Sequence, residues 1–224
     1  YMPCFMVGYS HAKLISDMLR VPLVEVSHQQ GHVAASLWSA GHLELMDQPH
    51  LAWHLSGGTT ELLLVEPDGK NVRCTKIGGT TDISAGQLID RTGQLLELPF
   101  PSGKHIDALS KDAQMKETFK VKCPGLEFSI SGVQNKVQRF HEKYGNASET
   151  AAYALRCVAG AVCKATENAL KEYPGLHVVF SGGVASNSML RELTAHFGPI
   201  FSQPQYSTDN AMGVAVLAAR TMEE

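Results

Sequence analysis

The apolar positions of the first fifty residues alternate between short runs and helically spaced segments. Cys4–Gly8 is a short apolar run that predicts a strand, and Lys13–Leu19 follows with a helical pattern. Val21–Val26 is rich in β-branched residues and predicts a second strand. Helical spacing predicts a helix over His28–Ala40, between a serine N-cap and a glycine at the C-terminal end. This strand–helix–strand–helix order is typical of an α/β protein.

The next block changes to a pattern of short strands. Leu51–Leu55, Glu61–Val65 and Val72–Ile77 each predict a strand. Ser56–Thr60 carries a glycine pair between the first two, and Pro67–Lys70 is a strong turn signal between the second and third. The block therefore predicts an antiparallel meander with a glycine pair in its first bend.

The second half of the chain returns to an α/β pattern. An apolar face running from Ile83 to Leu96 predicts a helix, and 110–123 is polar and lysine-bearing, which indicates a surface excursion. Phe128–Gly132 predicts a brief strand or turn. Ser148 is the expected cap of a long helix that ends before Pro174.

The C-terminal fifty residues predict one more strand and two helices. Val178–Phe180 reads as a buried strand that runs into a Ser-Gly-Gly turn. The helices are expected over roughly Asn187–His196 and Asn210–Met222.

Composition narrows the class of protein. Hydrophobic residues make up 44% and charged residues 18% of the 224 residues, which excludes a disordered chain and suits one large domain or two small lobes. The net charge of −3 means that a nucleic-acid partner must meet a local patch or an accessory subunit. Five cysteines without a Cys-x-x-Cys pair indicate thiols of a reducing, cytoplasmic compartment. No apolar run reaches the ~18 residues that would cross a membrane. The opening Tyr1-Met2-Pro3 is neither a signal peptide nor an ordinary start, so we expect the chain to begin partway into a longer protein.

Two histidines form the first candidate site. His28 and His32 stand at i and i+4, so on a helix their imidazoles face the same side and can share one metal ion. Two protein ligands do not complete the coordination of a metal ion. A third ligand, an oxygen from elsewhere in the chain, would still leave coordination positions free for a substrate. The spacing alone is also compatible with two ordinary polar histidines. The general base of a His-Glu-x-x-His protease is absent because Gln29 follows His28.

Two glycine-bearing strand ends form the second candidate site. They are Ser56-Gly57-Gly58 and Ser181-Gly182-Gly183. Glycine lets the backbone approach a ligand closely, and free N–H groups at such turns suit phosphate oxygens. Either device alone would be an ordinary tight turn. The two together favour nucleotide binding.

Three polar residues have both a structural and a functional interpretation. Asp209 precedes an apolar helix, where an aspartate is an ordinary N-cap. Asp90 reads as a solvated helix charge, and Asn187 reads as a helix cap or a ligand contact.

These motifs, in this order, resemble the TsaD-type tRNA threonylcarbamoyladenosine transferases, once labelled O-sialoglycoprotein endopeptidases. The matching segments are VEVSHQQGH (24–32), LSGGTT (55–60), AGQLIDRTGQLL (85–96), Pro101–Gly103, FSISG (128–132), VFSGGVASNSMLR (179–191) and TDN (208–210). The resemblance covers nearly the whole chain. It implies an actin-like, sugar-kinase- or Hsp70-like α/β fold with two RNase-H-like lobes, the first incomplete. Residues 1–50 and the C-terminal helix, about 205–224, would belong to the N-terminal lobe, and residues 51–204 to a C-terminal nucleotide-binding lobe with a helical insertion.

The resemblance also implies a reaction and a set of site residues. The family transfers a threonylcarbamoyl group from threonylcarbamoyl-adenylate to N6 of adenosine 37 in tRNA. Its metal ligands, for iron or zinc, fall on His28, His32 and Asp209. Its nucleotide-binding positions fall on Ser56, Gly57, Gly58, Asp90, Gly103 and Asn187, to which the second glycine pair adds Gly182 and Gly183. The implied ligand is threonylcarbamoyl-AMP, ATP or AMP. The implied partners are tRNA, a related actin-like-fold subunit and a small ATPase, with no membrane.

The sequence departs from the family pattern at several positions. Gln30 and Gln87 stand where the family usually has glutamate, Thr59 stands where it has histidine, and Ser102-Gly103-Lys104 replaces Gly-Gly-Pro. The N-terminal hairpin that opens the family has no counterpart in this sequence. The substitutions keep two alternatives open beside the transferase. One is a non-catalytic, metal- and nucleotide-binding scaffold subunit, and the other is a metal-dependent peptidase.

Overall fold

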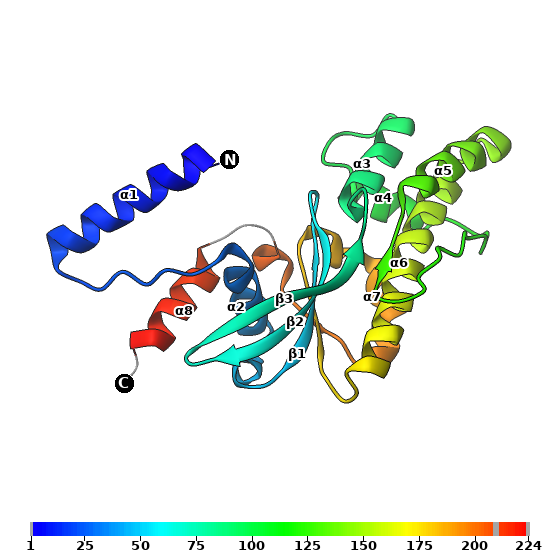
Figure 1. Ribbon diagram of the computed structural model, residues 1–224. Coiled ribbons are helices and arrows are strands. Elements are labelled where there is room, and N and C mark those ends of the chain that lie inside the picture. The colour runs from blue at the N-terminus through cyan, green and yellow to red at the C-terminus, as the bar shows by residue number, and fades with distance from the viewer. Residues whose placement is uncertain (1, 208–210, 223–224) are drawn as a thin grey trace.

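A mixed six-stranded sheet is the centre of the fold. The computed structural model describes residues 2–207 and 211–222, and the strands lie in the order β4-β3-β2-β1-β5-β6. The strands are β1 His50–Leu55, β2 Thr60–Asp68, β3 Asn71–Thr80, β4 Glu127–Phe128, β5 Val178–Ser181 and β6 Ile200–Phe201. β1, β2 and β3 pair antiparallel, whereas β5 runs parallel to both β1 and β6 and β4 parallel to β3 (Figure 1). The predicted meander and the α/β class are confirmed.

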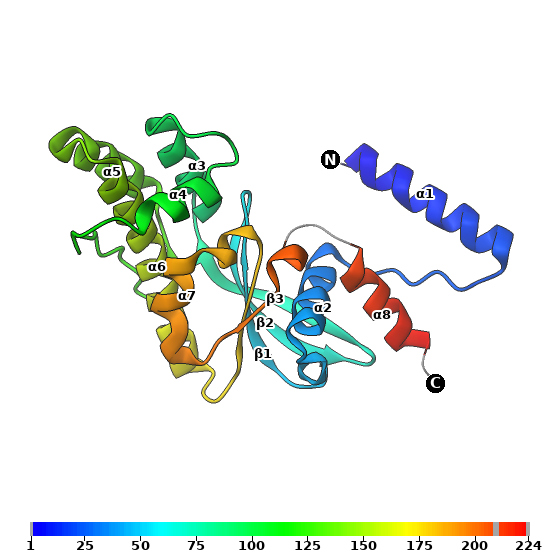
Figure 2. The same cartoon turned by 180° about the vertical axis from the view of Figure 1, so that it is seen from behind.

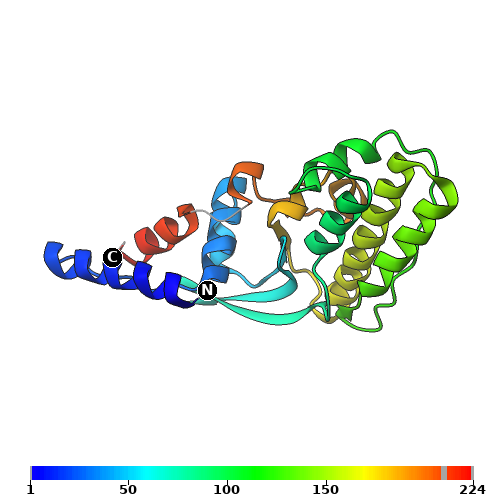
Figure 3. The same ribbon diagram turned by 90° about the horizontal axis from the view of Figure 1, so that it is seen from above.

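Helices cover both faces of this sheet. The α-helices of the described residues are α1 Met2–Leu19, α2 His28–Ala40, α3 Ala85–Leu95, α4 Gly103–Ser110, α5 Ser131–Tyr144, α6 Ala147–Glu172, α7 Ser188–Thr194 and α8 Met212–Met222, of which all but α1 lie against the sheet or its covering helices. Figure 2 shows α2 and α8 beside one another on one side of the strands and α6 with α7 on the other. Figure 3 shows α3 to α7 gathered at one end of the molecule and α1, α2 and α8 at the other.

Alternation along the central strand explains the two layers. Leu51, Trp53 and Leu55 of β1 pack into the cluster that includes α3, α5 and α6, whereas Ala52 faces the cluster under α2 and α8. Successive side chains of a strand point to opposite faces, so one strand contributes to both cores. The buried indole of Trp53 donates a hydrogen bond to Thr166 Oγ1 of α6 at 2.9 Å, which ties the strand to the longest helix.

The two strands predicted before residue 27 are wrong. Cys4–Gly8 lies inside α1, which is one continuous helix, and Val21–Val26 has no regular structure. A strand needs a neighbour for its backbone hydrogen bonds. No strand of the described sheet pairs with Val21–Val26, so its β-branched composition does not produce one. α1 extends away from the rest of the chain in Figures 1 and 3.

The helices of the second half differ from the predicted pattern in three places. α4 and α5 were not predicted, and α6 is capped by Asn146, whose Oδ1 accepts a hydrogen bond from the N–H of Glu149, rather than by Ser148. The 111–123 excursion contains neither helix nor strand, as predicted, and its four lysines are exposed. Because α2 and α8 pack on the sheet that the later strands form, the division into lobes at residue 50 stays a prediction.

Candidate functional site

The histidine pair lies at the start of α2. Ser27 caps this helix in an extended conformation, and Gly41 ends it with a φ of 76°, as the sequence predicts. His28 and His32 therefore occupy one helix face, and their Nε2 atoms lie 3.1 Å apart. His32 is 6% exposed, and His28 is exposed. The first turn of α2 thus brings two imidazole nitrogens to one point.

A third imidazole, which sequence reasoning did not find, joins this pair. His54 lies in β1 at 9% exposure, and its ring centroid is 4.4 Å from that of His32. The hydroxyl of Ser181 on β5 donates to the carbonyl of Trp53 at 2.9 Å and lies 3.4 Å from His54 Nδ1. His54 carries no spacing signal because it belongs to the buried alternation of a strand, and only the approach of β1 to α2 places it here.

The spacing of the histidine pair suits a shared metal ion. Two nitrogen ligands at ~2.0–2.1 Å from one ion stand about 3 Å apart, close to the separation of His28 Nε2 and His32 Nε2. The expected oxygen ligand, Asp209, lies outside the described residues. Within 2–207 and 211–222, no group of three or more His, Cys, Asp or Glu side chains is arranged to hold a metal. The three-ligand site therefore stays a prediction.

The first glycine turn connects β1 to β2. The N–H of Ser56 donates to the carbonyl of Thr59 at 2.8 Å, and the N–H of Thr59 donates to Ser56 Oγ at 3.1 Å. The turn is also held by the start of α3, because Ser84 Oγ donates to the carbonyl of Gly57 at 2.6 Å. A Cβ on Gly86 would lie 2.5 Å from Gly57 Cα, so the helix can approach this closely only with glycine there.

The second glycine turn follows β5. Gly182 has a φ of 88°, in the left-handed region that favours glycine, and a Cβ there would collide with the backbone of Leu55. Gly182 therefore serves the contact between the ends of β5 and β1 and is buried. Gly183 is exposed beside it. The close approach of the two strand ends brings the two Ser-Gly-Gly turns together.

Two adjoining cavities lie around these turns. The histidine cavity, ≈ 490 Å³, is lined by His28, Gln29, His32, His54, Ser56, Gly57, Gly58, Thr59, Glu61, Gly183 and Ser207. The aspartate cavity, also ≈ 490 Å³, is lined by Gly57, Gly86, Ile89, Asp90, Phe100, Pro101, Gly103, Lys104, His105, Asp107, Gly183, Val184, Ser186 and Asn187. Gly57 and Gly183 line both, so one glycine from each turn stands at the boundary. All the expected nucleotide-binding residues except the buried Gly182 thus line one or both of these two cavities.

The polar residues of the aspartate cavity have partners within the protein. Asp90 accepts a hydrogen bond from the N–H of Ser102 at 2.8 Å, which holds the segment before Gly103 against α3. Asn187 caps α7 through its Oδ1 and donates from Nδ2 to Asp107 Oδ1 at 2.7 Å. The same oxygen of Asp107 accepts from the N–H and Oγ of Ser188 at 2.9 and 2.8 Å. Asp107 therefore joins α4 to α7 across the cavity.

Two of the departures from the family pattern have a structural role. Gln30 and Gln87 are each the third residue of a helix, and each side chain accepts the N–H of its N-cap, Ser27 and Ser84 respectively. Glutamine and glutamate both complete such a capping box. Gln30 also donates to the carbonyl of Val72 at 2.7 Å. Neither residue lines the two cavities, whereas Thr59, the third departure, lines the histidine cavity.

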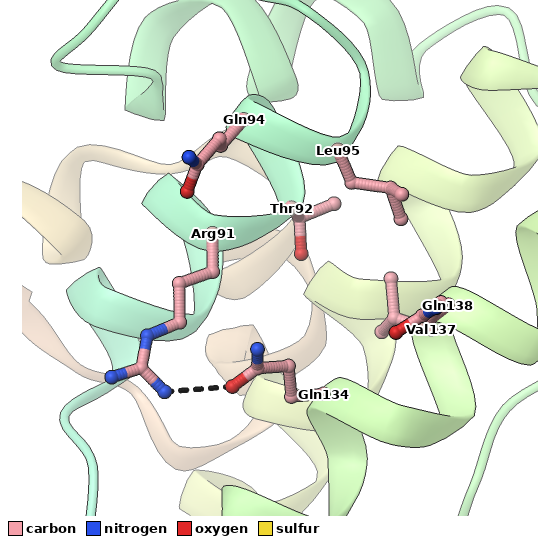
Figure 4. A pocket seen from close by; sticks show the side chains of 7 residues that line it. All are labelled: Arg91, Thr92, Gln94, Leu95, Gln134, Val137 and Gln138. Atoms are coloured by element: carbon pink, nitrogen blue, oxygen red, sulfur yellow. Dashed lines mark hydrogen bonds between the residues drawn. The ribbon is translucent and has the colours of Figure 1, made fainter.

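A further hollow lies between α3 and α5. Figure 4 shows Arg91 reaching across it to Gln134, to which it donates a hydrogen bond of 2.7 Å. Thr92, Gln94, Leu95, Val137 and Gln138 complete its lining. None of the expected site residues belongs to it. α3 therefore separates this hollow from the aspartate cavity, presenting Asp90 to one and Arg91 to the other.

Comparison with known sequences gives a consistent result. Residues 1–216 match the family model described as "TsaD: tRNA N6-adenosine threonylcarbamoyltransferase". A tRNA N6-adenosine threonylcarbamoyltransferase of Carboxydothermus hydrogenoformans is 36% identical over 221 residues, covering 94% of this chain and 65% of the relative. One of Enterococcus faecalis is 34% identical over 200 residues, covering 85% of this chain and 56% of the relative. The chain thus spans less than two thirds of the length of these relatives.

Comparison with solved structures supports the fold. HypF of T. kodakarensis superposes with a TM-score of 0.70 at 14% identity, covering 96% of this chain and 39% of that protein. An activator of the 2-hydroxyisocaproyl-CoA dehydratase from Clostridium difficile, solved with bound ADPNP, gives a TM-score of 0.52 at 15% identity, covering 88% and 65%. The predicted actin-like fold class is confirmed. Among the described residues, no helix is both long and apolar enough to cross a bilayer.

Proposed function

Because the chain belongs to the TsaD family of tRNA N6-adenosine threonylcarbamoyltransferases, we propose that it transfers a threonylcarbamoyl group from threonylcarbamoyl-adenylate to N6 of adenosine 37 in tRNA. The observation that carries this proposal is the meeting of the two cavities at Gly57 and Gly183. A single ligand that crosses this boundary contacts the histidine pair at one end and the aspartates at the other. A nucleotide joined to an acyl group has that extended shape.

The aspartate cavity is proposed to hold the adenosine part of the donor. Its apolar walls, Ile89 and Val184, suit a purine. Asp90 and Asp107 are the acceptors that ribose hydroxyls require, because each carboxylate has lone pairs beyond those its protein partners use. The exposed backbone at Gly57 and Gly183 lets the phosphate pass close to the turn between the cavities.

The histidine cavity is proposed to hold the reacting group. The amine N6 attacks the carbamoyl carbon, the bond from that carbon to the phosphate oxygen breaks, and AMP leaves with the electron pair while the amine loses a proton to water. His28, His32 and Asp209 would hold a divalent metal. When bound, such an ion supplies charge stabilisation at the carbonyl or the departing phosphate. The protein's own contribution is to align donor and acceptor, and no protein nucleophile is needed.

The capping roles of Gln30 and Gln87 lower the support for a non-catalytic scaffold. That alternative rests on the loss of ionisable groups near the cavities, and two of the three groups instead close helix ends. Thr59 remains as the single departure inside the histidine cavity. A peptidase has no support from the described residues. Gln29 stands where a His-Glu-x-x-His protease has its glutamate base, and its side-chain amide donates a hydrogen bond to Glu61 at 3.2 Å.

A single-turnover assay tests the proposal. The protein is mixed with threonylcarbamoyl-adenylate and unmodified tRNA, with and without the actin-like-fold subunit and the small ATPase that we expect as partners. Product formation that His32→Ala abolishes and the surface variant His42→Ala retains would support the transferase. Adenylate binding without transfer under all these conditions would instead support the scaffold.

A further inference from the structure

Phe100 is exposed at the edge of the aspartate cavity. Its side chain is 82% exposed, more than any other large apolar side chain among the described residues for which exposure is given. It lies in the connection between α3 and α4, which bows out on the side of the β1–β2 turn (Figure 1). Exposing an aromatic ring of this size costs hydrophobic free energy. The ring is therefore accessible to a molecule outside this chain.

The chain on both sides of Phe100 is fixed. Ser102 is 1% exposed, its N–H donates to Asp90 Oδ1 at 2.8 Å, and its hydroxyl donates to the carbonyl of Pro99 at 3.0 Å. Gly93 of α3 packs directly on the Ser102 side chain and has no room for a Cβ. The exposed ring thus stands on an anchored connection, which suits a preformed contact surface.

A lysine and a histidine accompany the ring. Lys104 and His105 are exposed in the first turn of α4 and line the same cavity. The two carboxylates nearby, Asp90 and Asp107, both accept hydrogen bonds from inside the protein. An exposed aromatic face next to such donors is the combination that binds single-stranded nucleic acid, because bases stack on the ring and phosphates accept hydrogen bonds from the lysine ammonium and the imidazole N–H.

We propose that Phe100, Lys104 and His105 form a docking platform for the RNA substrate, on which a base next to the acceptor adenosine stacks. This inference rests on the proposed function for the identity of the substrate. The adenine of the donor is the other group that could stack on Phe100. We expect the adenine to pack against Ile89 and Val184 of the aspartate cavity instead.

Two separate affinities test the platform. Binding of an unmodified anticodon stem-loop RNA is measured by fluorescence anisotropy, and binding of AMP is measured by calorimetry, both on the full chain. Phe100→Ala is expected to weaken RNA binding roughly 5- to 100-fold, the range found for a base that loses its aromatic partner. It should weaken AMP binding much less, because Phe100 stands at the edge of the aspartate cavity. Phe100→Tyr keeps the ring and should restore RNA binding. The affinity for RNA falls as the salt concentration rises. Lys104→Ala should make this fall shallower, reducing the magnitude of the slope of log affinity against log salt by about 0.7, as expected for one lost phosphate contact to a single strand.

Matched variants and the outcomes complete the test. Leu193→Ala removes a partly exposed apolar side chain from α7, and Lys70→Ala removes a lysine from the β2–β3 turn. Both should bind RNA like the unaltered chain. If Phe100→Ala weakens AMP and spares RNA, the ring serves the donor and the platform is wrong. If the unaltered chain binds RNA and Phe100→Ala binds it equally well, the platform alone fails. If the unaltered chain binds AMP but no RNA, the proposed function fails with it.

Discussion

Gln30 and Ser27 close the first turn of α2 by exchanging hydrogen bonds. The N–H of Ser27 donates to Gln30 Oε1 at 2.6 Å, and the N–H of Gln30 donates to Ser27 Oγ at 3.2 Å. The amide nitrogen of Gln30 reaches β3 through the carbonyl of Val72. The residue that differs from the family pattern beside the histidines therefore fixes the helix that carries them.

This arrangement predicts that Gln30→Glu does not raise the rate of transfer. Glutamate can keep the bond to the N–H of Ser27, but it cannot donate to the carbonyl of Val72. Gln30→Ala should lower the free energy of unfolding by about 1 kcal/mol, because it removes one side of a capping box. Urea denaturation and single-turnover transfer measure the two effects. A large gain in the rate of transfer in Gln30→Glu would contradict this prediction and show that an ionisable group at this position contributes to catalysis.

Removing one histidine should empty the proposed metal site. His32→Ala leaves a single imidazole on α2, so the purified variant should contain much less iron or zinc than the unaltered chain. His42→Ala is the matched control, because His42 is exposed and pairs with Glu44 at 3.0 Å. Elemental analysis after identical purification measures the content. Equal metal in all three proteins would contradict the site.

Gly86→Ala should weaken nucleotide binding. The added methyl group would lie 2.5 Å from Gly57 Cα and from the carbonyl oxygen of Ser56, so the first glycine turn must move away from α3. Gly160→Ala is the matched control, because Gly160 is exposed on α6, lines neither cavity, and a Cβ there meets no atom within 4 Å. Calorimetric titration with AMP should show a loss in the first variant and a smaller change in the second. Equal affinities would show that the turn's position does not matter for binding.

Asp82 predicts an acid-dependent loss of stability. Burial by itself would raise the pKa of Asp82, but hydrogen bonds from Ser129, Ser131 and the N–H of Ile130 outweigh it and hold the pKa well below its usual range. A carboxyl with a lowered pKa in the folded state stabilises the fold above its unfolded pKa of about 3.9, and that contribution is lost as the pH falls further. The free energy of unfolding should therefore drop below about pH 4. Asp82→Asn should be less stable at pH 7 and show a shallower drop; identical pH curves would contradict this role.

The buried bond between Trp53 and Thr166 should be costly to break. Thr166→Val keeps the shape of the side chain but leaves the indole N–H of Trp53 without its partner in a site where both residues are 0% exposed. An unsatisfied buried donor costs about 1–3 kcal/mol. Thr166→Ser, which retains the hydroxyl, is the control and should lose less. Thermal denaturation of the two variants measures the difference.

The sequence by itself determined the elements whose signals are local. The cap and spacing of His28–Ala40 and the turn at Pro67–Lys70 set their own structures, because capping and turn geometry depend on residues a few positions apart. The same holds for the shared face of His28 and His32. The two Ser-Gly-Gly patterns predicted two turns at strand ends, and Gly57 and Gly183 line both cavities, whereas nucleotide binding there stays a prediction.

The tertiary structure alone decided what depends on contacts between distant residues. Val21–Val26 did not become a strand because no strand of the described sheet pairs with it. Residue type and spacing could not show that His54 would meet His32, that Asp107 would hold Asn187, or that Phe100 would stay exposed on an anchored connection. Each of these follows from how strands and helices far apart in the chain pack together, and packing is decided by the whole set of contacts rather than by any local pattern.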